Sequence, residues 1–139
     1  MFAVAGVTGQ TGRVVADTLL TRGHDVRVIV RDALKGAPWA ARGAEVAVAA
    51  LGDEPALTRA LTDVQGAYLL TPPDAVSLDF LASRRQLTDA LVAAVAASQV
   101  PHVVFLSSIG AHLEDPRIGP IAALRYGEQR LRRLTGQAV

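Results

Sequence analysis

The stretch that decides the fold is Gly6-Val7-Thr8-Gly9-Gln10-Thr11-Gly12, which directly follows the apolar segment Phe2–Ala5. This segment is typical of a buried strand, and the apolar residues after the last glycine recur at helical spacing. A glycine-rich turn between a strand and a helix is the context in which this spacing predicts a dinucleotide-binding loop. In such a loop Gly6 permits a tight turn, Gly9 lets the backbone approach a pyrophosphate, and Gly12 lets the helix pack closely on the sheet.

The start of the predicted helix adds an electrostatic argument. Its exposed N–H groups and its dipole together favour a bound phosphate. The alternative is a plain turn between a strand and a helix, because a chain with 12 glycines in 139 residues matches short glycine patterns easily. Three glycines in register, with a strand before them and a helix after them, favour the binding loop.

Strands and helices alternate along the rest of the chain. The predicted strands cover residues 2–5, 25–30, 45–49, 66–70 and 102–106. The predicted helices cover residues 11–21, 34–42 with an interruption near Pro38, 54–61 after an N-cap at Asp53, 77–98, and 121–134 after a loop at 107–119. The strands are continuous apolar runs, which indicate a parallel sheet covered on both faces. The sequence therefore predicts a doubly wound, Rossmann-type α/β fold with strand order 3-2-1-4-5.

Composition excludes several classes of function. The 139 residues suit one domain, and 50% hydrophobic against 19% charged residues leaves enough apolar surface for a core. A net charge of +1 gives no strong field for nucleic acid. Cysteine is absent and the 3 histidines are scattered, so neither a cysteine nucleophile nor a metal site is indicated. Without a leader segment or a run of about 18 apolar residues, we expect a cytoplasmic protein that does not enter a membrane.

The residues after the second predicted strand bear on the cofactor. NAD-binding proteins usually place an acidic residue there, which accepts a hydrogen bond from the ribose 2′-hydroxyl. This chain places Arg31 there, where a guanidinium can clamp a 2′-phosphate, and Lys35 can assist it. We therefore expect NADP(H) rather than NAD(H). Two alternatives stay open, because Asp32 could turn towards the ribose and serve NAD(H), or Arg31 and Asp32 could form a solvated pair.

The loops after the fourth and fifth strands complete the predicted site, since ligands bind at the carboxyl ends of strands in such sheets. We expect Thr71, with its neighbours Leu70 and Pro72, to line the ribose or nicotinamide side of the cofactor. Ser107 and Ser108 are placed to meet the nicotinamide or a substrate oxygen. The alternative is that the proline ends a strand and the serines cap one.

Taken in order, these features resemble the NmrA-like group of atypical short-chain dehydrogenases/reductases, close to the NAD(P)H:quinone reductase type. The matching segments are residues 6–12, 26–32, 52–54, 69–73 and 105–110, with Glu128 and Leu131 in the final helix. The resemblance covers essentially the whole chain. It implies that Thr8, Gln10 and Thr11 lie near the phosphates, that Arg31 holds the 2′-phosphate, and that a quinone is a possible hydride acceptor.

This chain departs from the family pattern at two positions. Many relatives have an aspartate where this chain has Ala50, so adenine recognition would fall to Leu51 and the backbone. Ordinary short-chain reductases use Tyr-x-x-x-Lys, in which the tyrosine donates a proton. This chain has Tyr126 followed by Arg130. Ser108, Tyr126 and Arg130 are therefore the catalytic candidates, and the alternative for the last two is a half-buried tyrosine beside a surface arginine.

The relatives continue past the final helix into further strands and a substrate lobe. We therefore expect residues 1–139 to form the NAD(P)-binding domain, truncated relative to the family. The absent sixth strand would leave an apolar sheet edge beside the fifth strand, which is a candidate surface for a second copy. Two functions stay open at this point. One is NADPH-dependent reduction of a quinone or carbonyl by hydride transfer, and the other is non-catalytic NADP(H) sensing by a regulatory domain.

Overall fold

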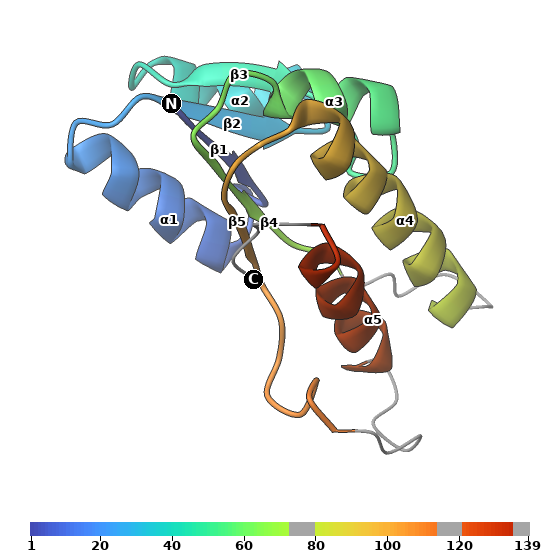
Figure 1. Cartoon of the computed structure of the whole chain (residues 1–139). Coiled ribbons are helices and arrows are strands. Elements are labelled where there is room, and N and C mark those ends of the chain that lie inside the picture. Colours follow the sequence, from blue (N-terminus) through green and yellow to red (C-terminus); the bar gives the residue numbers. More distant parts are fainter. Residues whose placement is uncertain (73–79, 114–120, 135–139) are drawn as a thin grey trace.

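The elements of the chain alternate as expected in the computed structural model, which describes residues 1–72, 80–113 and 121–134 (Figure 1). In chain order they are β1 (Phe2–Ala5), α1 (Gln10–Thr21), β2 (Val26–Val30), α2 (Ala33–Ala40), β3 (Glu45–Val48), α3 (Glu54–Leu61), β4 (Gly66–Leu69), α4 (Phe80–Ser98), β5 (Val103–Phe105) and α5 (Ile121–Arg132). All strand pairs are parallel, and the sheet has the order β3-β2-β1-β4-β5. The predicted Rossmann-type topology is therefore confirmed.

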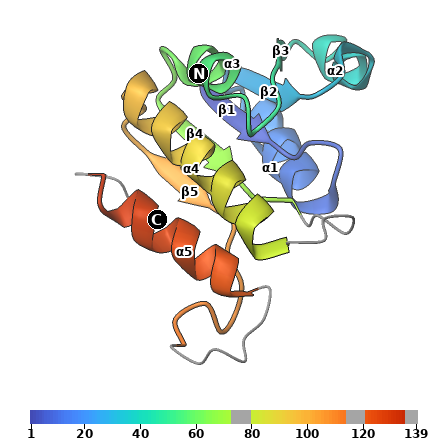
Figure 2. The ribbon, with the colours of Figure 1, turned by 90° about the vertical axis from the view of Figure 1, so that its right-hand side faces the viewer.

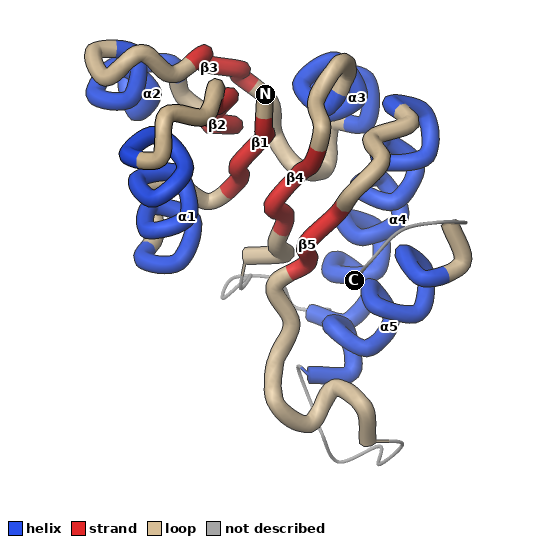
Figure 3. The backbone as a smooth tube through the Cα atoms, turned by 60° about the vertical axis from the view of Figure 1, so that its left-hand side comes forward, coloured by secondary structure: helices blue, strands red, loops and turns tan. Residues whose placement is uncertain are grey.

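Helices cover the two faces of the sheet unequally. Helices α1 and α2 lie on one face, over the half that holds β1, β2 and β3 (Figure 3). Helices α3, α4 and α5 lie on the other face, where they pack side by side (Figure 2). This division is what a doubly wound sheet produces, because the crossover from β3 to β4 moves the chain to the opposite face.

Alternate residues of β1 enter two different cores, as the period of a strand requires. Ala3 and Ala5 pack on the side of α3, α4 and α5, with Leu57, Leu91 and Phe105. Val4 packs on the side of α1 and α2 in a second cluster, whose other members include Ala16, Val28, Val30 and Trp39. Because β1 is the middle strand of the sheet, its carboxyl end lies at the centre of the edge where ligands are expected.

One part of the first face is left open, and we call it the open face. It is an apolar hollow over β1, β4 and β5, bordered by Phe2, Val15, Leu19, Tyr68 and Val104. None of the described helices covers β5 on this side (Figure 3), and Val104 is 62% exposed. Among the described strands β5 is an edge strand, so the hollow lies at one edge of the sheet.

The predicted boundaries agree with the structure within two residues where both can be compared, and the predicted start of the fourth helix at 77 lies outside the described residues. The predicted interruption at Pro38 is wrong, because α2 continues through it. A proline inside a helix removes one backbone hydrogen bond. Packing outweighs that loss here, since Trp39 is buried and Gly36 sits so close to Val46 that a Cβ would lie 2.4 Å from its Cγ1.

Candidate functional site

The glycine loop makes the sharp connection between β1 and α1. Gly6 has a φ of +70°, a conformation that glycine adopts without strain. The N–H of Gly9 donates to the carbonyl of Gly6 at 2.9 Å, which closes the turn. A Cβ on Gly12 would lie 2.4 Å from the carbonyl oxygen of Ala5, so only glycine allows α1 to start this close to β1. The loop therefore brings the N-terminus of α1 to the carboxyl edge of the sheet.

The N-terminus of α1 is open to an anion. Gly9 is its N-cap and supplies no side-chain hydrogen bond, and the first turn holds no acidic residue. Thr8, Gln10 and Thr11 are exposed around this end. Backbone N–H groups without an internal partner, together with the helix dipole, attract a phosphate to such a position.

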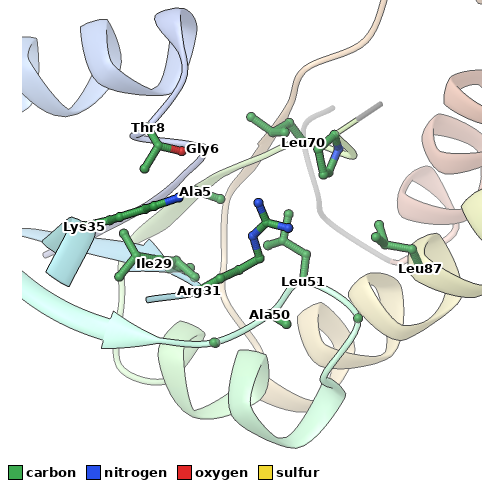
Figure 4. Close-up of a pocket in the computed structure, with 14 residues that line it drawn as sticks. Ala5, Gly6, Thr8, Ile29, Arg31, Lys35, Ala50, Leu51, Leu70 and Leu87 are labelled. Atoms are coloured by element: carbon green, nitrogen blue, oxygen red, sulfur yellow. The ribbon is translucent and has the colours of Figure 1, made fainter. Parts of the chain in front are cut away.

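A cleft of about 230 Å³ opens beside the loop, at the carboxyl ends of four neighbouring strands (Figure 4). The glycine loop and the ends of β2, β3 and β4 contribute to it, and α4 closes one side. Its lining is formed by Ala5, Gly6, Thr8, Ile29, Val30, Arg31, Lys35, Ala49, Ala50, Leu51, Gly52, Leu70, Pro72 and Leu87. Six of the residues that the sequence predicted to bind the cofactor therefore line this cleft, namely Gly6, Thr8, Arg31, Lys35, Leu70 and Pro72.

The charged side chains that line the cleft are both cations. Arg31 extends into it from the end of β2, and the side chain of Lys35 reaches from α2 towards Ala5 and the glycine loop (Figure 4). Asp32 lies between them in sequence, but its carboxylate caps α2 by accepting from the N–H of Leu34 at 2.9 Å. The acidic side chain that could have served an NAD ribose is thus engaged in starting a helix.

Apolar groups form the rest of the cleft. Ala50 and Leu51 lie on the connection between β3 and α3, whose N-cap Asp53 accepts from the N–H of Ala56 at 3.1 Å. Leu87 contributes from α4, and Leu70 from the end of β4. Ala50 stands where many relatives are expected to have an aspartate, and it does line the cleft. A flat base between aliphatic side chains suits this lining better than a charged group does.

The wall that follows β4 is fastened to α4 by a residue that sequence reasoning missed. Arg84 donates to Thr71 Oγ1 at 3.1 Å and to the carbonyl of Pro72. Both Arg84 and Thr71 are buried, and Thr71 is not among the residues that line the cleft. Arg84 shares a helix face with Leu87 and Leu91, at spacings of three and seven, so an arginine in an apolar stripe was the available signal.

The three catalytic candidates Ser108, Tyr126 and Arg130 are not among the described residues that line the cleft, and neither is Ser107, which was predicted to meet the cofactor. Ser107 Oγ is buried and has no hydrogen-bond partner in the described part of the chain. Ser108 is exposed, and its hydroxyl lies 3.4 Å from the carbonyl of Ile109, which is a poor hydrogen bond.

Tyr126 and Arg130 share a partner between α4 and α5. The Tyr126 hydroxyl donates to Asp89 at 2.7 Å, and Arg130 lies 3.5 Å from the same carboxylate. The hydrogen bond to Asp89, with desolvation and the negative charge of Asp89, raises the pKa of Tyr126 above its ordinary value despite the nearby arginines. A tyrosine held in this way is a poorer proton donor than a free one.

The described ranges 1–72, 80–113 and 121–134 contain no group of three or more histidine, aspartate and glutamate residues that could hold a metal ion. Within the same ranges, no helix is long and apolar enough to cross a membrane.

Comparison with known proteins finds reductases among the proteins to which this chain is similar. The chain is 32% identical, over 118 residues, to an NAD(P)H azoreductase of Xenophilus azovorans, and the match covers 84% of this chain and 38% of the azoreductase. Its fold matches an NADPH-dependent quinone oxidoreductase of Escherichia coli, solved with NADPH, with a TM-score of 0.80 and 27% identity. That match covers 97% of this chain and 46% of the oxidoreductase.

A triphenylmethane reductase of Citrobacter sp., solved with NADP(H), shares the fold with a TM-score of 0.85 at 23% identity. The match covers 96% of this chain and 46% of the reductase. The chain thus spans less than half the length of these relatives. Residues 1–117 match the model of the NmrA-like family. With this match over most of its length, the chain belongs to the NmrA-like family.

Proposed function

We propose that the cleft binds NADP(H) and that the chain serves in the transfer of hydride from it. The observation that carries this proposal is the pair of cations in the cleft, Arg31 and Lys35, beside an Asp32 carboxylate that caps α2. A 2′-phosphate has three acceptor oxygens for the two cations, whereas the 2′-hydroxyl of NAD carries no charge for them to pair with.

The residues present fit the other parts of the dinucleotide. The pyrophosphate would accept from the backbone N–H groups at the start of α1, where Gly9 leaves room for it. The adenine would lie between Leu51 on one side and Leu70 and Leu87 on the other. The nicotinamide would continue past the loop after β4, towards Ser107 at the end of β5.

The reaction is a reduction, for which the relatives are the support: an azoreductase, a quinone oxidoreductase and a triphenylmethane reductase. The reduced nicotinamide supplies two electrons and a proton as hydride when it is bound. A quinone that accepts the hydride becomes a hydroquinone anion, which takes its second proton from water. This chain's own residues therefore have to bind and orient the dinucleotide and leave its reactive face open, and no protein acid is required.

A second candidate function rests on a specific observation. Tyr126 and Arg130 are both engaged with Asp89 and lie outside the cleft lining. Reduction of a carbonyl needs a proton donor beside the cleft, whereas an NADP(H)-sensing domain without turnover needs the cleft alone, which is what this arrangement provides. It predicts that NADP and NADPH bind with different affinities while acceptors are not reduced.

The cofactor assignment is tested by thermal unfolding with saturating NADPH or NADH. A ligand at about 100 times its dissociation constant adds about 2.7 kcal/mol to the folded state, which raises Tm by several degrees. We expect this rise with NADPH, and a smaller one in Arg31→Gln and Lys35→Gln. Arg22→Gln is the matched control, since it removes one exposed positive charge at the end of α1 away from the cleft. If the rise in Tm with NADPH is reduced equally in all three variants, the effect comes from net charge and not from a phosphate site.

The two candidate functions are separated by an acceptor screen. Quinones and azo dyes are mixed with the protein and NADPH, and the consumption of NADPH is followed by its absorbance. Oxidation in proportion to protein concentration supports the reductase. Tight binding of NADPH with no oxidation on any acceptor supports the sensor.

A further inference from the structure

A buried arginine outside the cleft lining ties together the two elements that form one of its walls. Arg84 lies in α4 and is 5% exposed, although arginine is rarely buried unless its donors are paired. Its guanidinium donates to Thr71 Oγ1 at 3.1 Å and to the carbonyl oxygen of Pro72. Both acceptors belong to the segment that follows β4, so the fork of one side chain joins that segment to the helix.

The joined elements each send residues into the cleft. Leu70 and Pro72 flank Thr71 and line the cleft from the end of β4, and Leu87 lines it from α4, three residues after Arg84. Leu70 and Leu87 lie across the cleft from Ile29 and Lys35 (Figure 4). The position of this wall relative to the opposite one therefore depends on the contact that Arg84 makes behind it.

The wall has little freedom to move inwards. A Cβ on Gly6 would lie 2.4 Å from Leu70 Cδ2, so Leu70 already packs directly against the glycine loop. In the outward direction the neighbouring residues Thr71 and Pro72 are held by the hydrogen bonds of Arg84. Thr88 adds to the rigidity of this turn of α4, because its hydroxyl donates to the carbonyl of Arg84 at 2.7 Å.

We propose that Arg84 is a positioning residue that fixes, through Thr71 and Pro72, the width of the slot between Leu51 and Leu87. The inference rests on the proposed function, in which this slot holds the adenine of NADP(H). Arg84 touches no part of the dinucleotide. A lysine keeps the charge but offers a single ammonium, which cannot reproduce the planar fork to two acceptors. Methionine keeps much of the volume and removes the polar contacts altogether.

The experiment compares two dinucleotides that differ only in the base. NADP⁺ and its 1,N6-etheno derivative, which carries an enlarged adenine, are titrated into wild-type protein, Arg84→Met and Arg84→Lys. Arg85→Met is the matched control, because it removes the same charge from the exposed neighbouring position. The readout is the ratio of the two dissociation constants, which a general loss of folded protein leaves unchanged.

We expect wild-type protein and Arg85→Met to prefer NADP⁺. Arg84→Met should weaken the binding of NADP⁺ by about 10-fold, because binding then has to order the released wall. It should also bring the ratio of the two constants towards one, because a released wall admits the larger base. For Arg84→Lys, the affinity for NADP⁺ and the ratio of the two constants should both lie between those of wild-type protein and Arg84→Met.

Other results would contradict either the role of Arg84 or the proposed function itself. An unchanged ratio in a folded Arg84→Met refutes the role of Arg84 while the proposed function stands. If Arg84→Met does not fold, Thr71→Val removes one acceptor of the fork and carries the same test, and an unchanged ratio there is equally decisive. A wild-type protein that binds neither dinucleotide overturns the proposed function, and this inference falls with it.

Discussion

Replacing Gly12 by alanine tests whether the close approach of α1 to β1 is what the glycine spacing serves. The added Cβ would lie 2.4 Å from the carbonyl oxygen of Ala5, and 2.5 Å from both the carbonyl carbon and oxygen of Gly6. The two distances to oxygen are about 0.8–1.2 Å short of an ordinary carbon–oxygen contact of about 3.3–3.6 Å. All three atoms belong to the backbone at the end of the central strand, so no flexible side chain can move aside.

The cost follows from that geometry. Overpacking in a core costs about 1–3 kcal/mol when neighbours can adjust, and here we expect the upper end, about 3 kcal/mol. For a domain of this size that corresponds to a fall in Tm of about 10 °C. Urea denaturation followed by circular dichroism measures the change, which should appear as a lower midpoint with an unchanged slope.

Gly9→Ala is the matched control within the same loop. A Cβ at Gly9 meets only the carbonyl oxygen of Gly6, at 3.4 Å, and φ of Gly9 is −101°, which any residue adopts. We expect its stability to change by less than about 1 kcal/mol. On the proposed function the affinity of Gly9→Ala for NADPH should nevertheless fall, since the methyl group would narrow the space left for the pyrophosphate at the start of α1. Equal stability of Gly12→Ala and Gly9→Ala would refute the packing argument.

Three further predictions concern other parts of the fold. Arg27→Met should lower the free energy of unfolding by about 1–3 kcal/mol in urea denaturation, because the largely buried guanidinium donates to Glu45 at 2.7 Å and to two carbonyl groups at the end of α3. No loss would show that this contact is solvated. Tyr126→Phe should leave any turnover with quinones intact. The hydrogen bond to Asp89 raises the pKa of Tyr126 in the folded state. The stability that this bond contributes is therefore present below about pH 10, and it declines as the pH rises above that value towards the raised pKa. The difference in stability between wild type and Tyr126→Phe should therefore shrink above about pH 10, and a difference that grows there would contradict the assignment. The apolar surface of the open face favours pairing of two copies, which should appear as a concentration-dependent dimer in sedimentation equilibrium. Val104→Lys should convert this dimer to a monomer. A wild-type protein that is monomeric at every concentration would exclude pairing.

The fold was predictable because its signals are local. Continuous apolar runs and helical spacing located every described strand and helix, and the glycine loop placed the N-terminus of α1 at the sheet edge. Asp53 was expected as an N-cap and is one. Pro38 was misjudged because its effect depends on the packing of Trp39 and Gly36, which no local pattern contains.

The site was predictable to a smaller extent. Arg31 and Lys35 could be placed in the cleft, because the carboxyl end of a parallel strand has a fixed position relative to its neighbours. Two roles could not be foreseen, since each depends on a partner far away in the chain. Arg84 reaches the segment after β4, and Tyr126 finds Asp89 on another helix.

The central claim is that the cations of this cleft select a 2′-phosphate, and calorimetric titration with NADPH and NADH at the same ionic strength tests it most directly. Charge-assisted hydrogen bonds contribute about 1.5–3 kcal/mol, so NADPH should bind about 10- to 100-fold more tightly than NADH, and the gap should narrow as salt is added. Equal affinities, or a preference for NADH, would contradict the account of Arg31 and Lys35.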